Sequence, residues 1–188
     1  MRILDSVVDR GLIAAADRSG VYVLEWKESM CTRWNVHFDA ESAPCCTANL
    51  FVSSTPLRDI YIACITDDKC AWTYKLSRER NAFDRILKCR FAKRLSSIQI
   101  VNDGSSVVIA DKVGDVYHLI LDEQNTFDGK LSNIEDDESE TVKTSSNVIK
   151  ASNVLLMGHF SCLTDARVHN VGNAGSMIIA SADRDNKA

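Results

Sequence analysis

The strongest constraint on the fold is a short pattern that occurs four times along the 188 residues. Each copy has an apolar, strand-like run followed by a polar turn that contains Asp, and in the first three copies a second apolar run follows the turn. The first Asp residues of the turns stand 50, 44 and 72 positions apart. Such self-similarity predicts a fold made of repeated units. The copies are Ile13–Val23, Ile62–Trp72, Val108–Tyr117 and Ile178–Ala188.

Each copy predicts a β-hairpin, because β-branched and aromatic residues favour strands while Gly and Asp favour the turn. A single hairpin cannot bury its apolar face, and the first two separations are close to the length of one propeller blade. The one helix candidate, Ser77 to Asp84, is short and highly charged. We therefore predict an all-β fold, a β-propeller, with a β-sandwich as the alternative.

The third separation is longer because an acidic and polar segment lies between residues 122 and 147. It contains the runs 135–140 and 144–147, which are rich in Glu, Asp, Ser and Thr. Such a segment cannot bury enough apolar area to offset the entropy of ordering it. We expect 122–147 to be a disordered insertion between blades, within one partial propeller that spans residues 1–188.

Composition narrows the classes of partner. The net charge of −4 and the pI near 5.6 argue against nucleic-acid binding by the whole surface. The seven Cys residues are odd in number and have no C-x-x-C spacing, so we expect reduced, buried thiols. The sequence has no apolar run near 18 residues and no secretory leader, which predicts an intracellular protein without a membrane partner.

Catalytic motifs are missing from the sequence. The four His residues have no metal-ligand spacing, and there is no phosphate-binding loop, dinucleotide-binding fingerprint or nucleophile elbow. We therefore predict no catalytic residue, no metal and no bound cofactor, and a small β-sandwich enzyme is the least favoured hypothesis.

One basic cluster occupies residues 85–94, and Arg90, Lys93 and Arg94 are its candidate binding residues. In a strand context these cations could line a rim of the propeller and attract RNA phosphate or an acidic partner. A solvated strand edge that is protected by charge explains the cluster equally well. Both interpretations remain open from the sequence.

Three sequence motifs follow one another along the chain: Val108–Tyr117, Leu155–Asp165 and Ile179–Lys187. Together they resemble the WD-repeat non-catalytic subunits of the eukaryotic tRNA (guanine-N7)-methyltransferase, over residues 60 to 187. The resemblance implies a seven-bladed propeller, of which this chain holds an N-terminal portion of about three and a half blades. We expect a truncated form with open strand edges.

The resemblance also implies a function. Such a subunit binds and stabilises the catalytic methyltransferase subunit as a heterodimer, and the complex forms 7-methylguanosine in the tRNA variable loop. S-adenosylmethionine would bind the catalytic partner, tRNA would be held mainly through the complex, and the location would be the nucleus. A general WD-repeat adaptor, such as a substrate receptor of a ubiquitin ligase, is the alternative.

Two sets of residues take roles from this resemblance. The first is the partner interface, for which a structural turn is the alternative: Asp183, Arg184, Asp185 and Lys187. The second resembles the buried polar network that fixes a WD-repeat blade: His159, Asp111 and Asp67.

Overall fold

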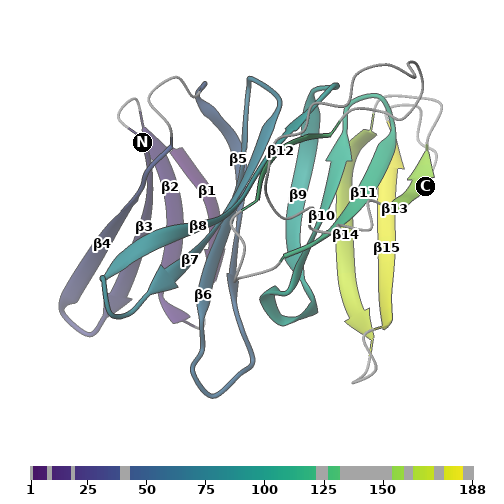
Figure 1. Cartoon of the computed structure of the whole chain (residues 1–188). Helices are drawn as coiled ribbons and strands as arrows, with labels where there is room; N and C mark the ends of the chain where they lie inside the picture. Colours follow the sequence, from purple (N-terminus) through teal and green to yellow (C-terminus); the bar gives the residue numbers. More distant parts are fainter. Residues whose placement is uncertain are drawn as a thin grey trace.

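The computed structural model describes residues 2–7, 10–17, 20–38, 43–121, 127–131, 154–158, 163–171 and 176–183. These residues form four β-sheets, which we call blades 1 to 4, and the short 3-10 helix η2 (Asn102–Gly104) lies between β9 and β10. The blades stand side by side in chain order from purple to yellow (Figure 1). The prediction of an all-β, partial propeller is confirmed. In the described part of the chain, no helix is long and apolar enough to cross a membrane.

Blades 1 and 2 are antiparallel sheets whose strands follow one another in the chain. Blade 1 contains β1 (Arg2–Val7), β2 (Leu12–Asp17), β3 (Gly20–Lys27) and β4 (Met30–Val36). Blade 2 contains β5 (Cys45–Val52), β6 (Ile60–Thr66), β7 (Cys70–Ser77) and β8 (Ala82–Phe91). The rejected helix candidate, residues 77–84, is the hairpin between β7 and β8.

Blade 3 contains β9 (Leu95–Val101), β10 (Ser106–Asp111), β11 (Asp115–Ile120) and β13 (Val154–Gly158). The described part of blade 4 consists of β14 (Leu163–Val171) and β15 (Ser176–Asp183). Within the expected insertion 122–147, five residues form β12 (Phe127–Leu131), which pairs in parallel with β8 of blade 2. The rest of that insertion lies outside the described residues.

The first strands of the blades, β1, β5, β9 and β14, lie next to one another. Polar side chains join each of them to the backbone of the next. The carboxylate of Asp5 accepts a hydrogen bond from the N–H of Leu50 at 2.6 Å, and Asn49 accepts one from β9. The amide of Gln99 both donates to and accepts from the backbone of Val168, at 2.9 and 2.8 Å. These bonds fix the register between neighbouring blades.

Apolar side chains fill the spaces between blades. Between blades 1 and 2, the buried residues include Leu12, Trp34 and Trp72. Between blades 2 and 3 they include Tyr61 and Ile109. Since each sheet buries residues on faces turned toward its neighbours, stacking supplies the apolar burial that a single hairpin lacks.

Candidate interaction surface

The second strands of all four blades end at the same edge of the molecule, the upper edge in Figure 1. Their last residues are Asp17, Thr66, Asp111 and Asp183. In blades 2 and 3 a tight turn leads from this residue into the third strand, and in blade 1 Asp17 pairs with Gly20, the first residue of the third strand. The repeated Asp pattern of the sequence therefore marks one face of the propeller.

In blade 3 this turn is fixed by a buried carboxylate. Asp111 is 1% exposed, and its Oδ1 accepts hydrogen bonds from the N–H groups of Val113, Gly114 and Asp115 at 2.8, 2.9 and 3.1 Å. The hydroxyl of Tyr117 donates to Asp111 Oδ2 at 3.2 Å. Burial, followed by the two neighbouring carboxylates, raises the pKa of Tyr117, so that it stays a donor.

In blade 2 the anchor is a different residue from the one that the sequence indicated. Thr66, 1% exposed, accepts a hydrogen bond from Trp72 Nε1 at 3.0 Å and donates to Asp68 Oδ1 at 2.5 Å. Asp67 is exposed, and within the described part of the chain its one hydrogen bond runs from its N–H to the carbonyl of Pro44 at 3.1 Å. The assignment of Asp67 to a buried network is therefore wrong, because the strand ends one residue earlier.

Blades 1 to 3 thus share one arrangement, in which the last residue of the second strand accepts a hydrogen bond from an aromatic side chain of the third. In blade 1 the hydroxyl of Tyr22 donates to Asp17 at 2.9 Å. Asp183 holds the equivalent strand position in blade 4, although its side chain is outside the description. Four further predicted residues also lie outside the described residues: His159, Arg184, Asp185 and Lys187.

The structure separates the three predicted basic residues. Lys93 is half-buried, and its Nζ lies 2.6 Å from Asp115 Oδ2, which raises the pKa of Lys93 by hydrogen bonding. Arg90 is exposed near the end of β8, while Arg94 is exposed in the segment that leads into β9. The carbonyl of Arg94 accepts a hydrogen bond from the N–H of Lys112 at 2.7 Å.

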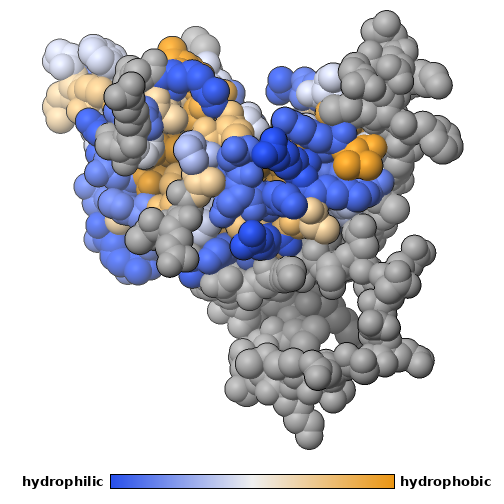
Figure 2. All heavy atoms as spheres, turned by 90° about the horizontal axis from the view of Figure 1, so that it is seen from above, coloured by the Kyte–Doolittle hydropathy of each residue, from blue (hydrophilic) through white to orange (hydrophobic). Residues whose placement is uncertain are grey.

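That bond holds two exposed cations over a small cleft of about 150 Å³ between blades 2 and 3. We call this cleft the notch. No described residue forms an ion pair with the side chain of Arg94 or Lys112. Seen from above, hydrophilic residues gather across the middle of this face (Figure 2). The notch is lined by Cys46, Thr47, Thr66, Asp67, Arg94, Leu95, Ser96 and Lys112.

Sequence reasoning missed Lys112, although a signal was available. Lys112 follows the anchoring Asp111 in the third copy of the repeat, as Asp67 follows Thr66 in the second. Aligning the copies by their strand ends would have placed Lys112 on the same rim as Asp67. Only the fold shows that Arg94, 18 positions earlier, lies beside Lys112.

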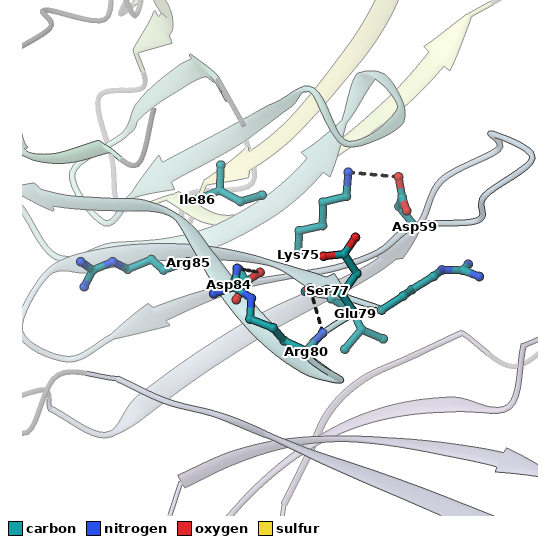
Figure 3. A pocket seen from close by; sticks show the side chains of 10 residues that line it. Asp59, Lys75, Ser77, Glu79, Arg80, Asp84, Arg85 and Ile86 are labelled. Atoms are coloured by element: carbon teal, nitrogen blue, oxygen red, sulfur yellow. Dashed lines mark hydrogen bonds and ion pairs between the residues drawn. The ribbon is translucent and has the colours of Figure 1, made fainter. Parts of the chain in front are cut away.

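A larger cavity of about 860 Å³ lies beside the hairpin between β7 and β8 (Figure 3). Its charges are largely matched within the protein: Lys75 lies 3.1 Å from Asp59, and Arg80 is ion-paired with Asp84. Glu79 adds a further negative charge to the lining. Arg78 and Arg85 also line this cavity, so the cavity and the notch each carry an excess of one positive charge.

Two other predictions can be compared with the described residues. Cys64, Cys70 and Cys89 are buried, but Cys31 and Cys46 are exposed, so the expectation of buried thiols holds for only part of the described Cys residues. The six described Cys residues are all free thiols. No group of three or more His, Cys, Asp or Glu residues in the described part could hold a metal ion.

Comparison with known proteins adds a family match. A family model described as the tRNA methyltransferase TRM82 WD40 domain matches residues 39–153. Proteins named tRNA (guanine-N(7)-)-methyltransferase non-catalytic subunit TRM82 are 30% identical in Candida glabrata over 128 residues and in Vanderwaltozyma polyspora over 139. These alignments cover 66% and 73% of this chain, and 25% of each relative. The chain thus spans about a quarter of the length of these relatives.

Proposed function

This chain belongs to the TRM82 WD40-domain family, and we propose that it acts as the non-catalytic subunit of a complex that methylates tRNA at guanine N7. The observation that carries the proposal is the family match, which covers all of blade 2 and β9 to β11 of blade 3. Two similar proteins, from C. glabrata and V. polyspora, bear the name of that subunit. In this role the chain binds and stabilises a catalytic partner as a heterodimer.

The face at the upper edge of Figure 1 supports this proposal because it offers two cations that form no ion pair with any described residue. Arg94 and Lys112 line the notch together with Asp67, and a partner carboxylate placed beside the two cations would meet a net positive charge. Complementary charges of this kind fix the orientation and choice of a partner more than they raise affinity. Asp183 ends the equivalent strand of the neighbouring blade 4, and we propose that Asp183, Arg184, Asp185 and Lys187 take part in the same contact.

We also propose which tasks fall to the other members of the complex. The catalytic partner binds S-adenosylmethionine and performs the methyl transfer, and tRNA is held mainly by the assembled complex. We place this complex in the nucleus. The chain contributes a fixed docking face, since its blades are held in register by Asp5, Asn49 and Gln99.

The test is co-expression of this chain with the catalytic guanine-N7 methyltransferase from the same organism. We expect the two proteins to copurify and the 7-methylguanosine content of tRNA, measured by nucleoside mass spectrometry, to rise above that with the catalytic protein alone. The double variant Arg94→Glu, Lys112→Glu should weaken the complex about tenfold, which corresponds to about 1.4 kcal/mol.

Lys27→Glu is the control, because Lys27 is also an exposed cation and lies at the far end of β3. It should copurify like the unchanged chain. Absence of copurification together with an unchanged 7-methylguanosine content would overturn the proposal. Capture of ubiquitin-ligase subunits in place of a methyltransferase would point to the adaptor alternative.

A further inference from the structure

The loop between β5 and β6 presents a four-residue segment, Thr55–Arg58, whose sequence is T-P-L-R. All four residues are exposed. The chain has two Pro residues, and Pro44 follows an Ala, so Thr55 is the one Ser or Thr that precedes a Pro. Because the turn between β6 and β7 lies at the upper edge, the loop at the other end of β6 lies at the lower edge of Figure 1.

These four residues form a β-turn that can be opened. The N–H of Arg58 donates to the carbonyl of Thr55 at 2.9 Å, and Pro56 holds the second position, where its fixed φ favours a turn. Arg58 has a φ of 49°, in the left-handed region that residues with a Cβ seldom adopt. Straightening the segment on a partner would break the hydrogen bond of the turn but would release Arg58 from this conformation.

The ends of the loop are fixed, so that the turn is held out from the sheet. The N–H of Ser53 donates to the carbonyl of Asp59 at 2.9 Å, and the N–H of Asp59 donates to Ser53 Oγ at 2.9 Å. The N–H of Ser54 donates to Asp103 Oδ1 of blade 3 at 2.6 Å. Ser53 is 2% exposed and shares a 2.8 Å hydrogen bond with the hydroxyl of Thr55. An enzyme can therefore reach the hydroxyl of Thr55 but not that of Ser53.

We propose that Thr55 is phosphorylated by a protein kinase that selects Pro directly after the acceptor residue and a basic residue at the third position after it. Pro56 has no N–H, so a kinase groove without an acceptor at this position favours Pro over residues whose N–H would be left unbonded. The exposed guanidinium of Arg58 suits a carboxylate of the kinase. Thr55 Oγ1 attacks the γ-phosphorus of ATP, the bond to the β–γ bridging oxygen breaks, ADP leaves, and the hydroxyl proton passes to a base of the kinase.

Cations near the turn can hold the phosphate once it is attached. The guanidinium of Arg78, in the hairpin between β7 and β8, already reaches the loop and donates to the carbonyls of Leu57 and Arg58. Asp59, the acid of the loop itself, is ion-paired with Lys75 at 3.1 Å (Figure 3). A phosphate group carries close to two negative charges at neutral pH and pairs strongly with Arg. We therefore expect Arg58 and Arg78 to pair with the phosphate and to hold the modified loop against the hairpin.

Since the loop and the notch lie at opposite edges, the modification is tested on the full chain without a partner. The chain is incubated with a purified cyclin-dependent kinase and Mg-ATP, and phosphopeptides are mapped by mass spectrometry. We expect phosphate at Thr55, which Thr55→Ser retains and Thr55→Ala removes. Arg58→Ala should lower kcat/KM about tenfold. Arg90→Ala removes an exposed Arg at the other end of blade 2 and should leave kcat/KM unchanged. Phosphate on another residue in place of Thr55, or equal kcat/KM for Arg58→Ala and the unchanged chain, would overturn the proposal.

A pH titration of the phosphorylated chain, followed by phosphorus NMR, tests the pairing with Arg78. A neighbouring guanidinium favours the dianion, so it lowers the second pKa of the phosphothreonine. Arg78→Ala should therefore raise this pKa. Arg80→Ala is the matched control in the same hairpin, because Arg80 is ion-paired with Asp84, and it should leave the pKa unchanged. The same pKa in Arg78→Ala and in the unchanged chain would overturn the pairing of the phosphate with Arg78.

Discussion

The turns that follow the second strands of blades 2 and 3 hold the same position in their sheets, but different chemistry fixes them. In blade 3, the buried carboxylate of Asp111 gathers three backbone N–H groups and the hydroxyl of Tyr117. In blade 2, the hydroxyl of Thr66 bonds Trp72 and Asp68 without a buried charge. An uncharged group can therefore replace a carboxylate at this position if an aromatic donor faces it.

The two turns also differ in what they contribute to the surface. In blade 3 the carboxylate of Asp111 is hydrogen bonded within the turn, and Lys93 is ion-paired with Asp115. The exposed cation of this turn is therefore Lys112. In blade 2 the exposed charge of the turn is Asp67. Since both turns border the notch, one blade supplies a positive rim and the other a negative one.

Removing the anchor of blade 3 should have the largest effect. Asp111→Ala leaves three N–H groups without their acceptor in the turn, and hydrogen bonds to a charged group each contribute about 1.5–3 kcal/mol. We expect a loss of about 3–4 kcal/mol in the free energy of unfolding, since water reaches part of the opened turn. The midpoint of urea unfolding, followed by circular dichroism, measures it. Asp111→Asn keeps one acceptor oxygen and should lose less; equal losses for both variants would contradict the role of the carboxylate.

The corresponding change in blade 2 should cost less. Thr66→Val preserves the shape of the side chain but leaves Trp72 Nε1 buried without its acceptor, which costs about 1–3 kcal/mol. Thr66→Ser retains the hydroxyl and serves as the control. If Thr66→Val destabilised the chain as much as Asp111→Ala, the contrast between a charged and an uncharged anchor would not hold.

High pH should weaken the anchor of the turn in blade 3 and leave the anchor of the turn in blade 2 unchanged. The folded chain raises the pKa of Tyr117 above its ordinary value of about 10, so the unfolded chain loses this proton first as the pH rises. The contribution of Tyr117 is therefore complete below about pH 10 and is lost as the pH rises further. The raised pKa of Lys93 has the same sign, because its ion pair with Asp115 is lost when the amine deprotonates.

Tyr117→Phe should therefore flatten the decline in unfolding free energy between about pH 9 and about pH 11 relative to the unchanged chain. Urea unfolding at the two pH values gives the comparison. Trp72, the equivalent aromatic residue of blade 2, does not titrate, so Trp72→Phe should leave the slope unchanged even though it lowers stability. Parallel slopes for Tyr117→Phe and the unchanged chain would exclude the raised pKa of Tyr117 as a cause of the decline.

The sequence predicted the hairpins and the all-β fold because alternating apolar residues and turn residues are local signals. The sequence also indicated Asp111 as a member of the buried polar network, since Asp111 ends a clear apolar run. It could not place the anchor of blade 2, since Thr66 and Asp67 are adjacent and only the pairing of β5 with β6 decides where the strand ends. The ion pair of Lys93 joins residues 22 positions apart, and no local pattern predicts such a contact.

The smallest effect should follow from changing the residue that the repeat pattern wrongly marked. Asp67→Ala removes an exposed side chain, and substitutions at such positions usually change the unfolding free energy by less than about 0.5 kcal/mol. The N–H of Asp67 keeps its bond to the carbonyl of Pro44 in the variant, because only the side chain is lost. The urea midpoint should therefore stay near that of the unchanged chain, while Thr66→Val lowers it. A loss for Asp67→Ala that matched or exceeded that of Thr66→Val would restore Asp67 as the anchor and remove it from the negative rim of the notch.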